Sequence, residues 1–458
     1  MHISFRCKIA YSRQKPRKEM VMRKADTRKV KFVRDDTLIV AIDVGMEMNH
    51  GYCTTPDGKD IKPFKFDNTR DGMDKLWGMV MASKNRFQCE EIIVGYESTG
   101  PYGEPLVHYL MKKPVMLVQI NPMHTKRVKE ISDNSPLKTD DKDPRVIADI
   151  IKLGRTLSIV IPEGDAAYLR RLNNSRERHV KERTALVNQL QQLVFLLFPE
   201  FKKVLKNIKC RTPLYLLKKY PTPESISVLE TPVLGEEMRK KSRGKFREHH
   251  ADMLINLAKN TVGIREGVAG ISMDIRHILV QLEMLKSLIA EIENEMEIAL
   301  GRIPYSSKLL SIKGLGIVSV AGIIGEIGDF KKFQTQGEIM KLAGLDLYEI
   351  SSGKMKGQRR ISKRGRSLLR KILYYAAIQT IRKNGILYDY YTRLTDRGMK
   401  RMMALVAVSR KLLGIIYAIV LSLRSFQAFL SVHNILPFYS MQRLLIYPKF
   451  AFEFLLVV

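Results

Sequence analysis

The sequence predicts an α/β domain built on a mixed sheet, followed by mainly helical regions. Between residues 36 and 161, short apolar runs rich in β-branched residues alternate with helical patterns, which indicates strands and helices in turn. After Pro162, leucine and isoleucine recur every three or four residues over long stretches, as in amphipathic helices. At 458 residues the chain is long enough for two or three domains, each with its own core.

Two of the predicted strands end in a carboxylate. The apolar run 37–42 leads into Asp43 and a glycine, and the run 91–96 leads into Glu97 and a second glycine turn. Such runs are typical of strands buried on both faces, where a lone carboxylate is costly unless it is paired or binds a metal. A single Asp of this kind is most simply a strand-end turn residue. Its repetition at Glu97 favours a functional role.

A third segment adds two more carboxylates, Asp140 and Asp143, just before a helical pattern. Residues three apart face the same way on a helical turn. Asp143 is also a candidate N-cap, with Pro144 at the first helical position, but that local role does not account for Asp140. Together with Asp43 and Glu97, these side chains predict a hard-oxygen site for Mg²⁺ or Mn²⁺. Two such ions can hold the attacking and leaving oxygens of a phosphodiester.

The charge balance predicts a polyanionic partner. The formal net charge is +31 and the pI about 9.9, which indicates nucleic acid or an anionic membrane surface. The most apolar stretch, Leu412–Leu423, is about a dozen residues long, too short to cross a bilayer. No signal peptide is recognised, and residues 1–35 are expected to form a basic flexible arm. The four cysteines show no CxxC pair, so neither a zinc site nor a disulfide framework is expected. These features predict a cytoplasmic nucleic-acid-binding protein with no membrane partner.

Residues 163–300 are predicted to form a coiled-coil arm with a basic helical insert. Apolar seams over 165–200 and 272–300 indicate two antiparallel helices, and the second seam is expected to mediate self-association. The alternative is that each helix packs on the core of its own domain. Within the insert, Tyr220–Glu224 predicts a helix start, and Arg239–Arg247 predicts a basic surface that contacts phosphates.

Residues 301–425 form the third predicted region, which has two features suited to nucleic acid. Lys313, Gly314 and Gly316 fit a helix-hairpin-helix, whose glycines expose backbone N–H groups to a phosphate; an ordinary helix–helix turn fits as well. A glycine-containing loop then carries basic side chains expected to bind phosphates. They are Lys354, Lys356, Arg359, Arg360, Lys363 and Arg364. Residues 426–458 form an apolar tail without a clear pattern.

The role of Ser352, in the same loop, is open on the residues alone. A hydroxyl is a weak nucleophile until a base or a metal activates it. The local sequence therefore favours a phosphate-binding serine over a nucleophile.

Taken together, these motifs resemble those of the DEDD insertion-sequence transposases, relatives of the Piv-type DNA invertases. The resemblance runs from Leu38 to Leu423. Its motifs are Ala41-Ile42-Asp43, Tyr96-Glu97-Ser98-Thr99-Gly100-Pro101-Tyr102, Ile120-Asn121-Pro122, Lys138-Thr139-Asp140 with Asp143, Gly314-Leu315-Gly316, Ala343-Gly344-Leu345, Ser352-Gly353 and Ile361-Ser362-Lys363-Arg364-Gly365.

The resemblance implies a RuvC-like (RNase H fold) catalytic domain over 36–162, with Asp43, Glu97, Asp140 and Asp143 as metal-binding catalytic residues. It also implies a C-terminal transposase domain over 301–425 with Ser352 as the catalytic serine, which reverses the preference from the residues alone. The neighbouring Ser351 is the alternative serine. The long basic N-terminus, Pro144 and the apolar tail depart from the family pattern.

The function implied is an RNA-guided recombinase that uses Mg²⁺ (or Mn²⁺), a structured non-coding RNA, and donor and target DNA, acting as a homo-oligomer (dimer or tetramer). One alternative is a metal-dependent nuclease of the Holliday-junction-resolvase kind, in which water attacks and no covalent link forms. Another is a non-catalytic nucleic-acid-binding protein. The presence of all four carboxylates argues against the non-catalytic protein. Only the serine separates the recombinase from the resolvase-like nuclease.

Overall fold

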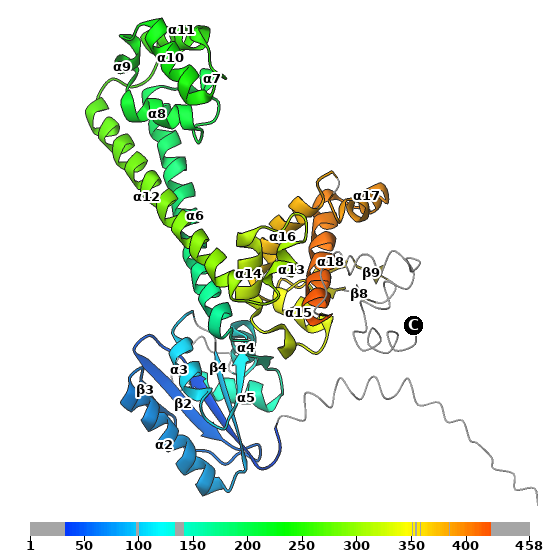
Figure 1. Ribbon diagram of the computed structural model, residues 1–458. Helices are drawn as coiled ribbons and strands as arrows, with labels where there is room; N and C mark the ends of the chain where they lie inside the picture. Colours follow the sequence, from blue (N-terminus) through cyan, green and yellow to red (C-terminus); the bar gives the residue numbers. More distant parts are fainter. Residues whose placement is uncertain are drawn as a thin grey trace, which may run out of the picture. The chain divides into compact units, whose positions relative to one another are not determined.

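The computed structural model describes residues 33–97, 100–132, 142–349, 351–352, 355–357, 359–383 and 385–422. The described residues divide into two compact units, one that ends at Val160 and one that begins at Ile161. The first unit carries a mixed sheet with helices, and the second is mainly helical (Figure 1).

The sheet of the first unit has the order β3-β2-β1-β4-β5-β6. β1, β4 and β5 are parallel, whereas β2, β3 and the short β6 are antiparallel to their neighbours. The predicted mixed sheet is therefore confirmed, and its order is consistent with a RuvC-like domain. The strands are β1 Thr37–Asp43, β2 Met48–Thr54, β3 Phe64–Asp67, β4 Glu91–Glu97, β5 Met116–Ile120 and β6 Leu157–Ser158.

Helices cover this sheet because its strands are apolar on both faces. Ile39, Ala41 and Ile93 belong to a buried cluster with the apolar side of α5, whereas Leu38 and Val40, which alternate with them, are also fully buried. α2 packs on β1, β2 and β3. The helices are α2 Arg70–Phe87, α3 Gly103–Leu110, α4 Pro122–Ser132 and α5 Lys142–Lys152.

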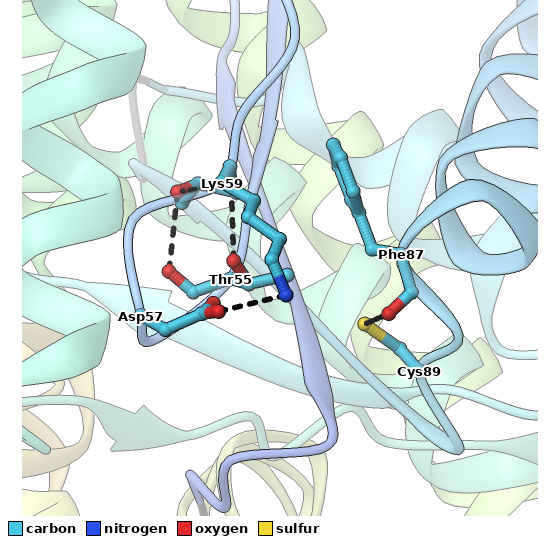
Figure 2. A network of polar contacts seen from close by, with 6 residues as sticks. Thr55, Asp57, Lys59, Phe87 and Cys89 are labelled. Atoms are coloured by element: carbon cyan, nitrogen blue, oxygen red, sulfur yellow. Dashed lines mark hydrogen bonds and ion pairs between the residues drawn. The ribbon is translucent and has the colours of Figure 1, made fainter.

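A tight turn follows β2, directly after the strand ends at Thr54. Thr55 donates its backbone N–H and its hydroxyl to the carbonyl of Lys59, at 2.9 and 3.1 Å, and Lys59 pairs with Asp57 at 2.9 Å (Figure 2). The hydroxyl of Thr55 and the ammonium of Lys59 hold the pKa of the Asp57 carboxyl below its ordinary value. Gly58 adopts φ = +95°, a conformation that glycine accepts without strain. The sequence Pro56-Asp57-Gly58 is typical of such a turn.

The second unit begins with two helices of 34 residues each, α6 Gly164–Leu197 and α12 Val268–Gly301. They pack along one another, and a group of short helices lies at the end of the pair where α6 stops and α12 begins (Figure 1). Ion pairs join the two long helices, including Arg176 to Glu293 at 2.7 Å and Arg302 to Asp165 at 2.6 Å. The short helices are α7 Phe201–Val204, α8 Arg211–Lys219, α9 Pro223–Ser227, α10 Thr231–Ser242 and α11 Glu248–Lys259.

The predicted helix start in the insert is confirmed at α9. Thr222 caps this helix, because its hydroxyl accepts a hydrogen bond from the Ser225 N–H at 3.2 Å while Ser225 caps the Thr222 N–H in return. The basic run after it is a surface, as expected: Arg239, Arg243 and Arg247 are exposed.

The apolar seam of α12, which was expected to mediate self-association, packs within its own chain. Leu282 and Ile289 are 8% and 5% exposed within the single chain. Leu282 belongs to the cluster that joins α6, α12 and the short helices. Because these side chains are already covered by their own chain, the alternative of packing within the subunit holds for this seam.

A helical region follows the long helices. The bounds are α13 Ser306–Leu310, α14 Ile317–Ile327, the 3-10 helix η1 Phe330–Lys332, α15 Gln336–Ala343, α16 Ser367–Thr380, α17 Tyr388–Asp396 and α18 Arg401–Ser422. α14 packs against α6, and Gly325 permits this close approach, because a Cβ there would lie 2.7 Å from the backbone nitrogen of Arg170.

α18, the last helix among the described residues, corrects the estimate of the apolar stretch near Leu412. α18 has 22 residues and is apolar and long enough to cross a membrane by length and composition, whereas the sequence suggested about a dozen residues. Two thirds of its most apolar window is buried within the protein, and it packs on α16, α17, α13 and α15. α18 is therefore a core helix of the second unit.

Candidate active site

The two predicted strand-end carboxylates are brought together by strand register. β1 and β4 are parallel and pair up to Ile42 with Tyr96, so Asp43 and Glu97 occupy the next position on each strand. Neighbouring strands lie about 4.8 Å apart, and residues in register point to the same face. Asp43 and Glu97 are each half-buried at the carboxyl edge of the sheet.

The face of the sheet that these carboxylates share is the one covered by α5. Side chains alternate along a strand, so Asp43 lies on the same side as Ile39 and Ala41, and Glu97 lies on the same side as Ile93. Those three apolar residues pack against α5 in one buried cluster. The carboxylates therefore extend the α5-facing side beyond its apolar core.

Asp143 reaches the same edge because of the direction in which α5 runs. The guanidinium of Arg145 lies 5.3 Å from the centre of the Tyr52 ring, and Lys152 donates to the Thr54 hydroxyl at 3.5 Å. On β2, Tyr52 is nearer than Thr54 to the edge that Asp43 occupies. α5 therefore begins near that edge, and Asp143, 7% exposed, lies in its first turn. The N-cap expectation for Asp143 is wrong by position, since the helix already begins at Lys142.

The close packing of α5 depends on a glycine in β4. A Cβ on Gly95 would lie 2.4 Å from Cδ1 of Ile151 and 3.1 Å from a methyl of Val118. The absence of a side chain at Gly95 thus permits the apolar side of α5 to lie directly on the sheet. That contact in turn sets the position of Asp143.

The loop after Asp43 is held by two buried or half-buried amides that the sequence analysis missed. Asn49 accepts from the Gly45 N–H at 3.2 Å and donates to Asn68 at 2.8 Å, and Asn68 donates to the Gly45 carbonyl at 3.1 Å. A Cβ on Gly45 would lie 2.2 Å from the Met48 carbonyl oxygen. An asparagine near the start of a buried hairpin strand is the sequence signal that could have indicated this support.

The fourth predicted carboxylate, Asp140, lies outside the described residues. Within the part of the chain that the structure describes, no three His, Cys, Asp or Glu side chains come close enough to hold a metal ion. The described donors are nevertheless of the kind that hard divalent ions prefer, since Asp43, Glu97 and Asp143 all supply carboxylate oxygens.

The predicted serine loop contains two nested pairs of short strands, which together form the serine hairpins. β7 Leu347–Tyr348 pairs with β10 Arg360–Ile361, and β8 Ser351–Ser352 pairs with β9 Met355–Lys356. The backbone of Ser352 is opposite Met355, and that of Ser351 is opposite Lys356. Lys354 lies outside the described residues. Ser352 therefore belongs to a strand that ends close to the tip of its hairpin.

Polar contacts fix the base of these hairpins. Ser362 donates its backbone N–H to the Asp346 carbonyl at 2.9 Å and its hydroxyl to the Asp346 carboxylate. Arg359 donates to the Glu349 carboxylate at 2.8 Å, which raises the pKa of its guanidinium. The pairing of Ser362 with Asp346 was not predicted from the sequence. Four predicted phosphate-binding side chains are exposed here: Arg359, Arg360, Lys363 and Arg364.

Three further residues predicted to bind phosphate lie before α14. Lys313 and Gly316 are exposed, and Gly316 is the N-cap of α14 without a side-chain cap. Gly314 has φ = +105°, which ends the turn that follows α13. The segment is a turn between the helices α13 and α14, and the exposed start of α14 suits an anion.

Comparison with known proteins shows which chains share these features. Residues 40–199 match the model of the DEDD transposases of the IS110 type, and residues 306–392 match the IS116/IS110/IS902 transposase family. The two matches together span more than half of the chain. The chain belongs to the IS116/IS110/IS902 transposase family.

The relatives agree with this assignment. The chain is 23% identical to the insertion element IS116 uncharacterized 44.8 kDa protein of Streptomyces clavuligerus, over 86% of this chain and 97% of the relative. It is 22% identical to the insertion element IS110 uncharacterized 43.6 kDa protein of Streptomyces coelicolor, over 84% and 94%. It is also 26% identical to the pilin gene-inverting protein of Moraxella lacunata, over 46% and 65%.

Within this transposase family, the first match covers most of the mixed sheet, α5 and α6, and the second covers α13 to α16, the serine hairpins and the start of α17. The regions that carry the acidic edge and the serine are thus the regions that the family models recognise. Family membership makes this chain a DNA-acting transposase or recombinase, and its DEDD-type domain indicates dependence on a divalent metal.

Proposed function

We propose that this chain is the transposase or site-specific recombinase of an insertion sequence, which cuts and rejoins DNA through a metal-assisted serine nucleophile and is guided by a structured non-coding RNA. One observation carries the proposal: strand register sets Asp43 beside Glu97 on the face covered by α5, whose first turn holds Asp143. Three separate segments of the chain thus supply carboxylates to one edge of the sheet.

The carboxylates fit Mg²⁺ or Mn²⁺ both by type and by arrangement. Two ionised carboxylates in adjacent positions repel each other, and a cation held by both relieves that repulsion. Asp43, Glu97 and Asp143 would hold the ion together with Asp140. When bound there, a divalent ion supplies electrophilic polarisation of the scissile phosphate.

Ser352 is the proposed nucleophile, and Ser351 is the alternative. The hydroxyl oxygen of Ser352 loses its proton and forms a new bond to phosphorus while one bridging P–O bond of the DNA breaks, and the departing deoxyribose oxygen takes up a proton. The hydroxyl end so released can later attack the phosphoserine and restore the serine, which exchanges strands without a net loss of phosphodiester bonds. The exposed Arg360, Lys363 and Arg364 support this role, since they attract the DNA phosphate and stabilise developing negative charge.

The proposed partners are donor DNA, target DNA and a non-coding RNA, bound largely through phosphates by a homo-oligomer in the cytoplasm. The net charge of +31 and the exposed basic run Arg239–Arg247 support binding to nucleic acid. RNA from the flank of the element should co-purify with the protein. Consistent absence of such RNA from active preparations would contradict guided targeting.

The decisive experiment is a denaturing gel of reactions with labelled DNA. Wild-type protein should form a covalent protein–DNA adduct that Ser352→Ala eliminates and Ser351→Ala retains. Asp43→Ala should eliminate the adduct while DNA binding remains. Asp71→Asn, an exposed carboxylate in the first turn of α2, is the matched control and should react normally.

The same gel separates the alternatives. An adduct lost with Ser351→Ala alone assigns the nucleophile to Ser351. Metal-dependent cleavage without an adduct in any variant contradicts the serine mechanism and supports a resolvase-like nuclease, for which the acidic edge is sufficient. Binding without cleavage or adduct under any condition supports a non-catalytic nucleic-acid-binding protein.

A further inference from the structure

A buried histidine beside the acidic edge has a ring nitrogen without a partner. His50 lies on β2, directly opposite Asp43 in the antiparallel pair of β1 and β2. The residue is only 9% exposed, and its Nε2 is inaccessible and makes no hydrogen bond to any described residue. Buried polar atoms in folded proteins are normally hydrogen-bonded or bound to an ion. This nitrogen therefore indicates a ligand site.

Strand register places His50 in one row with two of the carboxylates. Directly opposite residues of an antiparallel pair point to the same face, so His50 shares the α5-facing side with Asp43 and Glu97. The neighbouring Tyr52, two residues on, belongs to the buried cluster on that face, which confirms the alternation. The order along the row is His50 on β2, Asp43 on β1 and Glu97 on β4.

The spacing of this row suits a single ion above its middle member. Adjacent strands are about 4.8 Å apart, so His50 and Glu97 flank Asp43 at roughly equal distances. Their side chains are long enough to converge on one point over Asp43. In the side-chain positions seen here no three described His, Cys, Asp or Glu groups converge in this way. Convergence requires rotation about side-chain bonds only, because the backbone positions are set by the strand pairing.

We propose that His50 is a nitrogen ligand of the divalent ion held by Asp43 and Glu97, a role that rests on the metal site of the proposed function. An imidazole nitrogen adds more affinity for a transition ion such as Mn²⁺ than for Mg²⁺. His50 thus sets the metal preference of the acidic edge toward Mn²⁺.

His124 is the competing histidine at this edge. It lies on α4, which follows β5, and its Nδ1 also has no partner among the described residues. His124 is only partly buried, and β5, the strand that precedes its helix, is separated from β1 by β4 in the sheet order. No strand pairing aligns it with the carboxylates. The observations therefore favour His50.

The test is pulsed electron paramagnetic resonance of Mn²⁺ bound to the full-length protein, because it detects nitrogen bonded directly to the ion. Wild-type protein should show coupling to a directly bonded ¹⁴N nucleus. His50→Gln, which keeps a polar side chain of similar length, should remove that coupling and weaken Mn²⁺ binding by about tenfold. Mg²⁺ binding, measured by competition, should weaken less. His108→Gln is the matched control, since His108 is exposed on α3.

The possible results separate the role of His50 from the metal site itself. In one outcome, Mn²⁺ binds to the wild-type protein but not to Asp43→Asn, and the wild-type spectrum shows no nitrogen coupling. That outcome overturns the role of His50 and leaves the metal site intact. Failure to bind Mn²⁺, with or without DNA, overturns both. Coupling that persists in folded His50→Gln belongs to another histidine, such as His124, and overturns the inference. The wild-type spectrum alone shows whether nitrogen is bonded to the ion, so an absent coupling overturns the role of His50 whether or not His50→Gln folds.

Discussion

The acidic edge and the serine hairpins are held in place by different forces. The acidic edge is set by strands of seven residues, β1 and β4, and by a helix whose apolar side is buried on the sheet. The hairpins consist of strands of two residues, held by a few polar contacts such as Ser362 with Asp346 and Arg359 with Glu349. The carboxylates are therefore positioned by packing between distant parts of the chain, and the serine hairpins by contacts between residues close in sequence.

The largest effect is expected from removing a carboxylate at the rigid edge. Asp43→Asn or Glu97→Gln should lower the rate of DNA cleavage by about 10³-fold, because several kcal/mol of transition-state stabilisation depend on the bound ion. Thermal unfolding should be nearly unchanged, since both side chains lie beyond the apolar core. A variant that cleaves at the parental rate in Mg²⁺ would show that the edge is not the catalytic centre.

A smaller effect is expected from disturbing the helix that covers the edge. Gly95→Ala places a methyl group against Ile151 and should lower the free energy of unfolding by about 1–3 kcal/mol. The double variant with Ile151→Val removes the clashing Cδ1 and should recover part of that loss. Thermal or denaturant unfolding measures both variants. Equal stability of the single variant and the parent would mean that α5 does not rest on Gly95.

The same kind of change at the hairpins should affect local order far more than global stability. Ser362→Ala removes the hydroxyl that donates to Asp346, a contact worth about 1 kcal/mol. Hydrogen exchange over residues 347–361 should become faster, while the melting temperature changes little. A melting temperature that falls as far as in Gly95→Ala would show that the two regions are held in the same way.

The smallest expected effect is a difference in DNA affinity between variants of two neighbouring arginines of the hairpins. Arg360→Gln should weaken DNA binding uniformly across sequences and reduce the salt slope by about one. Arg359→Gln should do less, because Arg359 must leave Glu349 before it can bind a phosphate. Binding isotherms at several salt concentrations provide the comparison. A larger loss for Arg359 than for Arg360 would contradict the assigned order.

The sequence predicted the features that local pattern determines. Strands that end at Asp43 and Glu97, the turn at Gly58 and the helix start at Thr222 all follow from short runs of residue types. What it missed depends on residues distant in the chain. The place of His50 beside Asp43 follows from the β1–β2 register, and the need for Gly95 follows from contact with Ile151.

The length of α18 was underestimated for a related reason. Arg410 and Lys411 interrupt the apolar pattern of α18, and charges usually end a buried apolar stretch. In the fold, the ammonium of Lys411 lies 5.2 Å from the centre of the Tyr390 ring, and burial together with the charge of Arg393 lowers its pKa. Tertiary contacts with α17 thus accommodate a charge that the local sequence alone would exclude.

The paired helices α6 and α12 also set how far the short helices α7 to α11 lie from the other end of the pair, and how they are rotated about its axis. At about 1.5 Å per residue, 34 residues extend for about 51 Å, the length of about fifteen base pairs of duplex DNA. Insertion of seven residues into both helices would lengthen this span while turning the distal helices by only about 20°. Insertion of two residues would turn them by about 200° and direct the basic run Arg239–Arg247 to the opposite side. The length of the two helices sets the distance of that basic surface from the other end of the pair. The remainder of that length, counted in helical turns, sets the side on which the surface lies.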